Sequence, residues 1–109
     1  MLEPDEYYQS WCDDEGDPYV KMPGPFGTEI RVFNPSVEWH RLKWHRDTES
    51  RTIKVLKSCP GWFFQLDEKL PMALQEGMEF EIPYGCYHRA INKEASSPLE
   101  IQIIRKPLN

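Results

Sequence analysis

The stretch from residue 77 to residue 92, Gly-Met-Glu-Phe-Glu-Ile-Pro-Tyr-Gly-Cys-Tyr-His-Arg-Ala-Ile-Asn, constrains the fold more than any other segment of this chain. Gly77 permits a positive φ between two strands, and the alternation of polar and apolar residues over 79–82 is typical of a half-buried strand. Pro83 has no N–H group to donate and ends that strand. Gly85 makes the turn that follows, and His88 begins the next strand with its imidazole aimed inward.

Short strands separated by turns are expected along the rest of the chain as well. The strands that we predict cover residues 28–33, 37–46, 51–56, 62–66, 78–82, 87–92 and 99–104. No window shows the 3.6-residue apolar period of a helix, and ten prolines and six glycines supply the turns. Short, regularly spaced strands of this kind indicate a sandwich or a barrel. The sequence therefore predicts one antiparallel all-β domain, a β-barrel or jelly roll.

The charge of the chain is unevenly distributed. Residues 1–25 hold seven acidic residues, one lysine and four prolines, whereas residues 26–109 hold eleven acidic and twelve basic residues. We therefore expect an acidic, proline-rich N-terminal arm over 1–25 and a nearly neutral domain over 26–109. A basic face for nucleic acid is not indicated, so nucleic-acid partners are not expected.

The cysteine content and the apolar runs give expectations about the compartment. Cys12, Cys59 and Cys86 are an odd number without metal-type spacing, which favours reduced thiols in the cytoplasm over a disulfide framework. No apolar run approaches the roughly 18 residues that a membrane span needs. The first residues have neither the basic region nor the apolar stretch of a secretory signal. We expect a cytoplasmic protein that does not bind membranes.

The spacing of Gly77, Pro83, Gly85, His88 and Asn92 resembles the complete second motif of the cupin family. The resemblance implies a small single-domain cupin barrel with a first motif two or three strands earlier. The nearest match is the segment 45–58, in which the first histidine of the motif is kept as His45. The other three motif positions differ from the family pattern: they hold Asp47 for the second histidine, Arg51 for the glutamate and Ser58 for the glycine.

The resemblance implies a metal site inside the barrel. His45 and Asp47 lie two residues apart on an extended chain and so point to one face, where His88 would also point. Two imidazoles and a carboxylate suit Fe, Mn, Ni or Zn as divalent ions and leave coordination positions open. Arg51 cannot ligate a metal, but it can neutralise Asp47 or hold an anionic substrate through a bidentate contact. Glu49 shares the facing parity of Asp47 if the strand stays regular, but residues 48–50 are typical of a hairpin turn, so Glu49 is a weaker candidate ligand.

A metal-free barrel is the alternative, in which Asp47 and Arg51 form a structural ion pair and the protein binds or senses a small molecule without catalysis. In either case Trp62 and Gln65 are candidates to shape a substrate pocket, with Gln65 facing either the cavity or solvent. If the protein is an enzyme, the family resemblance implies metal-dependent chemistry such as that of a dioxygenase or an isomerase. It also implies a small-molecule ligand and a homodimer.

Overall fold

A computed structural model describes residues 17–106 of the chain. The strands in this part are β1 (Val20–Pro23), β2 (Glu29–Phe33), β3 (Ser50–Lys57), β4 (Trp62–Leu66), β5 (Met72–Ala73), β6 (Glu79–Ile82), β7 (His88–Asn92) and β8 (Leu99–Lys106). Two short 3-10 helices, η1 (Pro25–Gly27) and η2 (Trp39–Arg41), complete the regular structure. Within residues 17–106 there is no helix that is long and apolar enough to cross a membrane.

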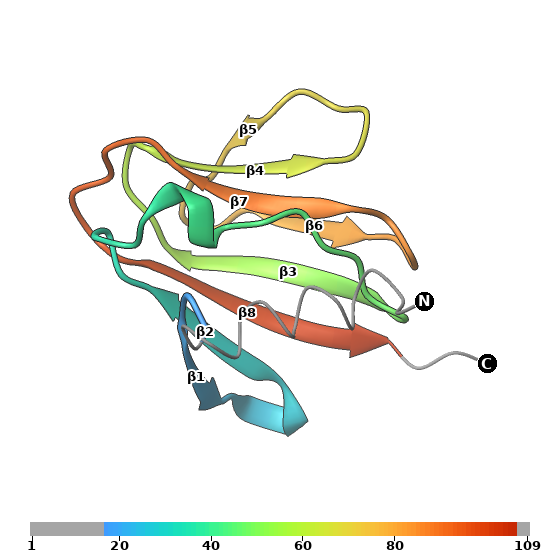
Figure 1. The fold of residues 1–109 in the computed structure, drawn as a ribbon. Coiled ribbons are helices and arrows are strands. Elements are labelled where there is room, and N and C mark those ends of the chain that lie inside the picture. Colours follow the sequence, from blue (N-terminus) through green and yellow to red (C-terminus); the bar gives the residue numbers. More distant parts are fainter. Residues whose placement is uncertain (1–16, 107–109) are drawn as a thin grey trace.

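The strands form two antiparallel sheets that face each other. One has five strands in the order β1-β2-β8-β3-β6, and the other has three strands in the order β5-β4-β7. Figure 1 shows them as two layers, with the connection between β2 and β3 running across the space between them. The prediction of an antiparallel all-β domain is confirmed.

Alternating residues of the strands fill the space between the sheets. On β8, Leu99, Ile101 and Ile103 are buried while their sequence neighbours are only partly covered, and β3 alternates in the same way. Trp62 of β4, which is 1% exposed, packs into this layer from the opposite sheet. Each large apolar side chain buried in this way contributes about 1.5–3 kcal/mol to the stability of the folded state. The core therefore holds the two sheets together.

The structure confirms the role of the turn residues of the 77–92 segment. Gly77 has a φ of 91° and Gly85 a φ of 71°, both in the region that favours glycine. β6 ends at Ile82, immediately before Pro83, and β7 begins at His88. The turn chemistry of this segment therefore decides where His88 enters the sheet.

The predicted strand over 37–46 is wrong. The Asn34 carboxamide accepts a hydrogen bond from the Ser36 N–H at 2.8 Å, and the Arg41 N–H donates to the Glu38 carbonyl at 3.0 Å within η2. These local bonds turn the chain, and only the isolated pairing of His45 with His88 has strand character. Turn-forming side chains that bond the nearby backbone compete in this way with an extended ladder.

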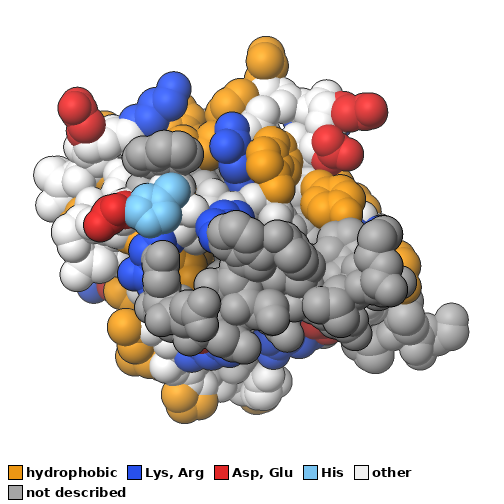
Figure 2. Space-filling view, in the orientation of Figure 1, with side chains coloured by type: hydrophobic (Ala, Val, Ile, Leu, Met, Phe, Trp, Pro, Cys, Tyr) orange, Lys and Arg blue, Asp and Glu red, His pale blue; other side chains and the backbone are white. Residues whose placement is uncertain are grey.

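Residues 20–23, which we assigned to the N-terminal arm, form β1 and pair with β2 at the edge of the five-stranded sheet. The remainder of the arm, residues 1–16, lies outside the described residues, so the predicted division at residue 25 stays a prediction there. Cys59 and Cys86 are free thiols, whereas Cys12 also lies outside the described part. On the described part of the face in Figure 2, acidic and basic side chains are interspersed with hydrophobic ones.

Candidate metal centre

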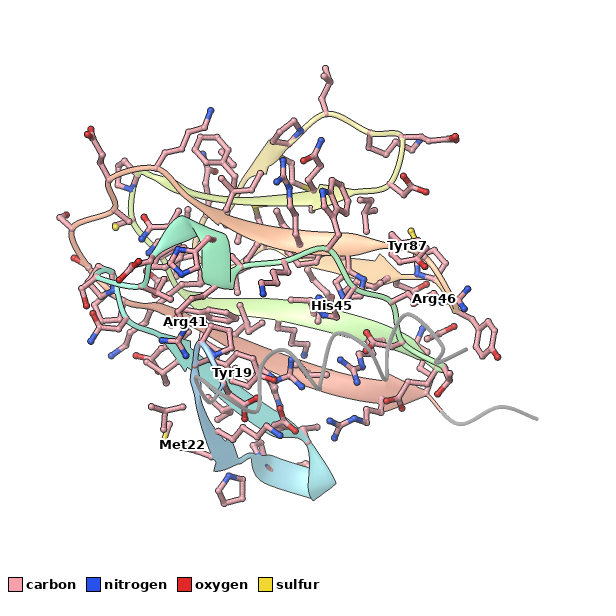
Figure 3. All side chains as sticks on the ribbon, viewed as in Figure 1. Tyr19, Met22, Arg41, His45, Arg46 and Tyr87 are labelled. Atoms are coloured by element: carbon pink, nitrogen blue, oxygen red, sulfur yellow. The ribbon has the colours of Figure 1, made fainter. Side chains whose placement is uncertain are left out.

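The backbone brings His45 and His88 together from distant parts of the chain. The His45 N–H donates to the His88 carbonyl at 3.0 Å, and the His88 N–H donates to the His45 carbonyl at 2.8 Å. Residues that face each other across an antiparallel pair carry their side chains on the same face. The two imidazole rings consequently lie with centroids 4.2 Å apart. Figure 3 shows His45 in the space between the two sheets.

Asp47 is held against the same turn that positions His88. The Gly85 N–H donates to the Asp47 carbonyl at 3.0 Å. The Asp47 Oδ2 atom lies 3.3 Å from His88 Nε2 and 3.1 Å from Arg51 Nη1. One potential ligand atom from each of His45, Asp47 and His88 lies within 4.8 Å of the others. The structure thus brings together the three residues that the sequence predicted as ligands.

Each histidine is oriented by a backbone carbonyl two residues earlier in the chain. His45 Nδ1 lies 3.1 Å from the Lys43 carbonyl oxygen, and His88 Nδ1 lies 2.9 Å from the Cys86 carbonyl oxygen. A carbonyl oxygen only accepts, so Nδ1 is the protonated nitrogen and the lone pair of each neutral ring is on Nε2. Metal-ligating histidines are usually fixed in this way by a hydrogen bond from the other nitrogen.

Burial keeps both imidazoles neutral near pH 7. Loss of solvation and the neighbouring His45 lower the pKa of His88 to about 4, against the opposing effects of the Cys86 carbonyl and Asp47. Loss of solvation is also the largest cause that lowers the pKa of His45. The ring of Phe64 stacks on His88 with centroids 5.6 Å apart and contributes to this burial. Neutral imidazole is the form that binds a metal.

Asp47 Oδ2 is a buried oxygen without a hydrogen bond. Arg51 and His88 both lie within ion-pair distance of it, but neither contact has hydrogen-bond geometry. A misaligned N–H group satisfies an acceptor poorly even at a short distance. The lone pair of His88 Nε2 and the carboxylate therefore face each other at 3.3 Å with no hydrogen between them. A cation between these atoms would remove that repulsion, so the residues present fit a metal ion.

A chain of alternating charges extends from Asp47 across the inner face of the five-stranded sheet. Its members are Asp47, Arg51, Glu49, Arg105, Glu29 and Arg31. Burial favours the neutral form of Glu29, but hydrogen bonds from Arg31 and Arg105 outweigh it and lower the pKa of that carboxyl. The three carboxylates and three guanidinium groups of this chain cancel in charge, so a divalent cation would add positive charge beside it.

A cavity of about 50 Å³ lies between the sheets beside these residues. His45, His88, Arg31, Arg51 and Lys43 line its polar part, and Tyr19 lies at the end towards β1 (Figure 3). The rest of its wall is apolar and comes from both sheets. The arrangement can therefore hold a small molecule next to the two histidines.

Two of the predicted pocket residues do not line this cavity. Gln65 lies on the outer face of the three-stranded sheet, where its carboxamide oxygen accepts hydrogen bonds from Arg89 at 2.9 and 3.0 Å. Trp62 belongs to the core, and its indole N–H donates to the Ser97 carbonyl at 2.8 Å. Glu49 pairs with Arg51 and Arg105 and does not belong to the group of potential ligands.

Arg31 is the cavity residue that the sequence analysis missed. The alternation over 28–33 places the apolar Ile30 and Val32 on one face and suggests that this face is the buried one. The structure instead buries Arg31 and Phe33 on the opposite face of β2. The sequence does contain one indication of this arrangement. Phe33 lies two residues from Arg31, so both side chains are on the same face of the strand, and a large aromatic residue indicates that this face is the inner one.

Comparison with known proteins identifies the fold. No model of a known protein family matches the sequence, and no curated protein matches it. An RmlC-like cupin family protein with a double-stranded β-helix fold from Methanocaldococcus jannaschii is similar in structure, with a TM-score of 0.63 and 15% identity over 85% of this chain and 84% of that one. A cupin-2 domain containing protein from Shewanella frigidimarina is also similar, with a TM-score of 0.55 and 18% identity over 83% of this chain and 79% of that one.

A chain from crystal structures of DMSP lyases also has a TM-score of 0.63, with 14% identity over 82% of this chain. The match covers 46% of that chain, so this protein spans about half the length of that neighbour. At these identities the comparisons bear on the fold alone. The chain has the cupin fold that the second motif predicted.

Proposed function

We propose that this protein binds a divalent transition metal through His45, Asp47 and His88, and that a small molecule binds beside the metal in the barrel. The observation that carries the proposal is the buried Asp47 Oδ2, which lacks a hydrogen bond and faces the lone pair of His88 Nε2 at 3.3 Å. Two imidazoles and one carboxylate suit Fe(II), Mn(II), Ni(II) or Zn(II).

The other residues of the site support this role. The Lys43 and Cys86 carbonyls fix the two rings before any metal arrives, which reduces the entropy lost on binding. Phe64 covers one face of His88 and limits the access of water to it. A bound metal would supply a Lewis acid with coordination positions open to water or a small anion. Arg51 lies 3.1 Å from Asp47 Oδ2 and holds the carboxylate beside the histidines.

Metal binding is tested by thermal unfolding of chelator-treated protein with and without added Zn(II), Mn(II), Ni(II) or anaerobic Fe(II). A metal at one hundred times its Kd stabilises the folded state by about 2.7 kcal/mol, which for a domain of this size raises Tm by about 10 °C or more. We expect that rise in the wild type and in Asp67→Asn, which changes an exposed carboxylate. Asp47→Asn should lose the rise. An equal rise in Asp47→Asn would contradict the proposal.

A metal-free binding barrel is the second candidate, and one observation favours it. Arg51 contacts both Asp47, at 3.1 Å, and Glu49, at 3.0 Å, while it is 8% exposed, as expected of a structural ion pair. If this candidate is correct, no metal raises the Tm of the wild type. Asp47→Ala then lowers the free energy of unfolding by up to about 3–5 kcal/mol, because Arg51 loses a buried partner.

A further inference from the structure

Arg31 is a buried arginine in the same cavity as the two histidines. It projects from β2, its side chain is 11% exposed, and it lines the cavity together with His45 and His88. Its charge is one of the causes that lower the pKa of His45, which agrees with the closeness of the two groups. A guanidinium group in such surroundings requires partners for its N–H groups.

The partners of Arg31 satisfy only one edge of its guanidinium group. Its Nε donates to Glu29 Oε2, and its central carbon lies 4.4 Å from the centre of the Tyr19 ring. Within residues 17–106, its Nη1 and Nη2 atoms have neither a hydrogen bond nor an ion pair. They are not fully enclosed either, because the only enclosed side-chain atom without a partner in that range is Asp47 Oδ2. The Nη1–Nη2 edge of Arg31, a residue that lines the cavity, is thus accessible to a ligand.

Arg51 differs from Arg31 in this respect. Its Nη1 lies 3.1 Å from Asp47, its Nη2 donates to Glu49 at 3.0 Å, and its Nε lies 3.4 Å from the same Glu49 oxygen. Glu49 therefore occupies the Nε–Nη2 edge of Arg51, and Asp47 lies at ion-pair distance from its Nη1, so the carboxylates of the protein surround the residue that the sequence analysis assigned to substrate binding. Arg31 is the better candidate for contact with an anion.

The shape of the site selects the class of ligand. A single free edge with two parallel N–H groups matches the two oxygens of a carboxylate, in the bidentate contact that arginine commonly makes. Tyr19 covers a face of the guanidinium group and directs a ligand to that edge. A cavity of about 50 Å³ has room for about two water molecules. The wall beyond the polar groups is apolar, so the remainder of the ligand should be a short carbon chain.

We propose that Arg31 binds the carboxylate of a small monocarboxylic acid with a short carbon chain inside the barrel. This deepens the function proposed above and rests on it for a metal at the other side of the cavity, whereas the contact with Arg31 needs no metal. A bound divalent ion adds positive charge to the site, so it should strengthen the binding of the acid.

The test is a calorimetric titration of acetate, propionate and pyruvate into the metal-free and the Zn(II)-loaded protein, with phosphate and acetamide as comparison ligands. The variants are Arg31→Gln and Arg31→Lys, with Arg89→Gln as the matched control. Arg89 lies on the outer face, 4.8 Å from the centre of the Trp44 ring and hydrogen-bonded to Gln65. Circular dichroism first establishes whether each variant is folded. If Arg31→Gln does not fold, the binding measurement on Arg31→Lys decides the test.

We expect a carboxylate to bind the wild type and Arg89→Gln more tightly than phosphate or acetamide. Arg31→Gln should weaken that binding by about tenfold or more, since a charge-assisted bidentate contact is lost. Arg31→Lys should weaken it by less, because it keeps the charge but loses the planar edge. Unchanged binding in both Arg31 variants, or no preference for carboxylates, would overturn the inference.

The two proposals fail in different ways. If the acid binds through Arg31 while Zn(II) does not bind at all, the proposed metal function is wrong and the Arg31 site stands. If Zn(II) binds and the affinity for the acid does not change in the Arg31 variants, the metal site stands and the proposed role of Arg31 is wrong.

Discussion

Mild acid should destabilise the metal-free protein through His88. Burial and the neighbouring His45 lower the pKa of His88 to about 4 in the folded state, whereas it is about 6.5 in an unfolded chain. Between these two values the unfolded chain binds a proton that the folded protein does not bind. The free energy of unfolding is therefore at its full value above pH 6.5 and falls as the pH drops towards 4.

The size of the effect follows from the two pKa values. For one group with these values, lowering the pH from 7 to 5 reduces the free energy of unfolding by about 2 kcal/mol. His45 acts in the same direction, because burial lowers its pKa as well. The interval from pH 7 to pH 5 lies above the range in which most carboxylates titrate, which separates the histidines from the acidic residues.

Urea unfolding of chelator-treated protein, followed by tryptophan fluorescence at pH 7, 6 and 5, measures this dependence. His88→Asn removes the titrating group and should flatten the curve, and His40→Asn, at an exposed position, is the matched control. A wild-type stability that does not change between pH 7 and pH 5 would refute the reasoning. So would a His88→Asn variant that keeps the full slope.

Two further predictions concern the turn and the core. Gly85→Ala forces a φ of 71° on alanine and should lower the free energy of unfolding in urea melts by about 1–2 kcal/mol; it should also weaken metal binding, because the Gly85 N–H holds Asp47. Gly27→Ala, at a φ of 76°, should cost similar stability without affecting metal, and equal metal affinity in both would contradict this role of Gly85. Ile103→Ala, at a side chain that is 2% exposed, should cost about 2–5 kcal/mol in the same assay. Leu70→Ala, at 88% exposure, should change stability by less than about 0.5 kcal/mol, and a comparable loss at both positions would argue against the assigned core.

The segment 77–92 could be interpreted from the sequence because its constraints are local. A positive φ that only glycine accepts readily, and a proline that cannot join a ladder, determine the same turn in any surroundings. The observed β6 and β7 agree with the predicted strands to within one residue at each end. The fold class followed from this segment together with the spacing of the other strands.

The segment 37–46 could not be interpreted in the same way, because the surrounding structure decides its conformation. Asn92 Nδ2 donates to the Pro35 carbonyl at 2.8 Å, which fixes the turn from the far end of β7. Leu42 is buried at 8% exposure although its segment forms no ladder apart from the single pairing of His45. His45 and Asp47 nevertheless lie together with His88, because that pairing extends the chain locally.

The polar lining of the cavity shows a further limit of sequence interpretation. Arg31 and Arg51 are both buried, and nothing in the sequence distinguishes the one enclosed by carboxylates from the one with a free edge. That difference depends on Glu49 and Asp47 reaching Arg51 while Glu29 reaches only Nε of Arg31. It arises from the packing of side chains across three strands, which residue spacing does not encode.

The most direct test of the proposed site is the metal content of the protein, measured by mass spectrometry on untagged protein that is purified without chelator and reconstituted with iron, manganese, nickel or zinc. His88→Ala removes a ligand, and His40→Ala is the matched control at an exposed histidine. We predict near-stoichiometric metal in the wild type and in His40→Ala, and its loss in a folded His88→Ala variant. A wild type that holds no metal after reconstitution, or a His88→Ala variant that holds as much as the wild type, would contradict the assignment of His45, Asp47 and His88 as ligands.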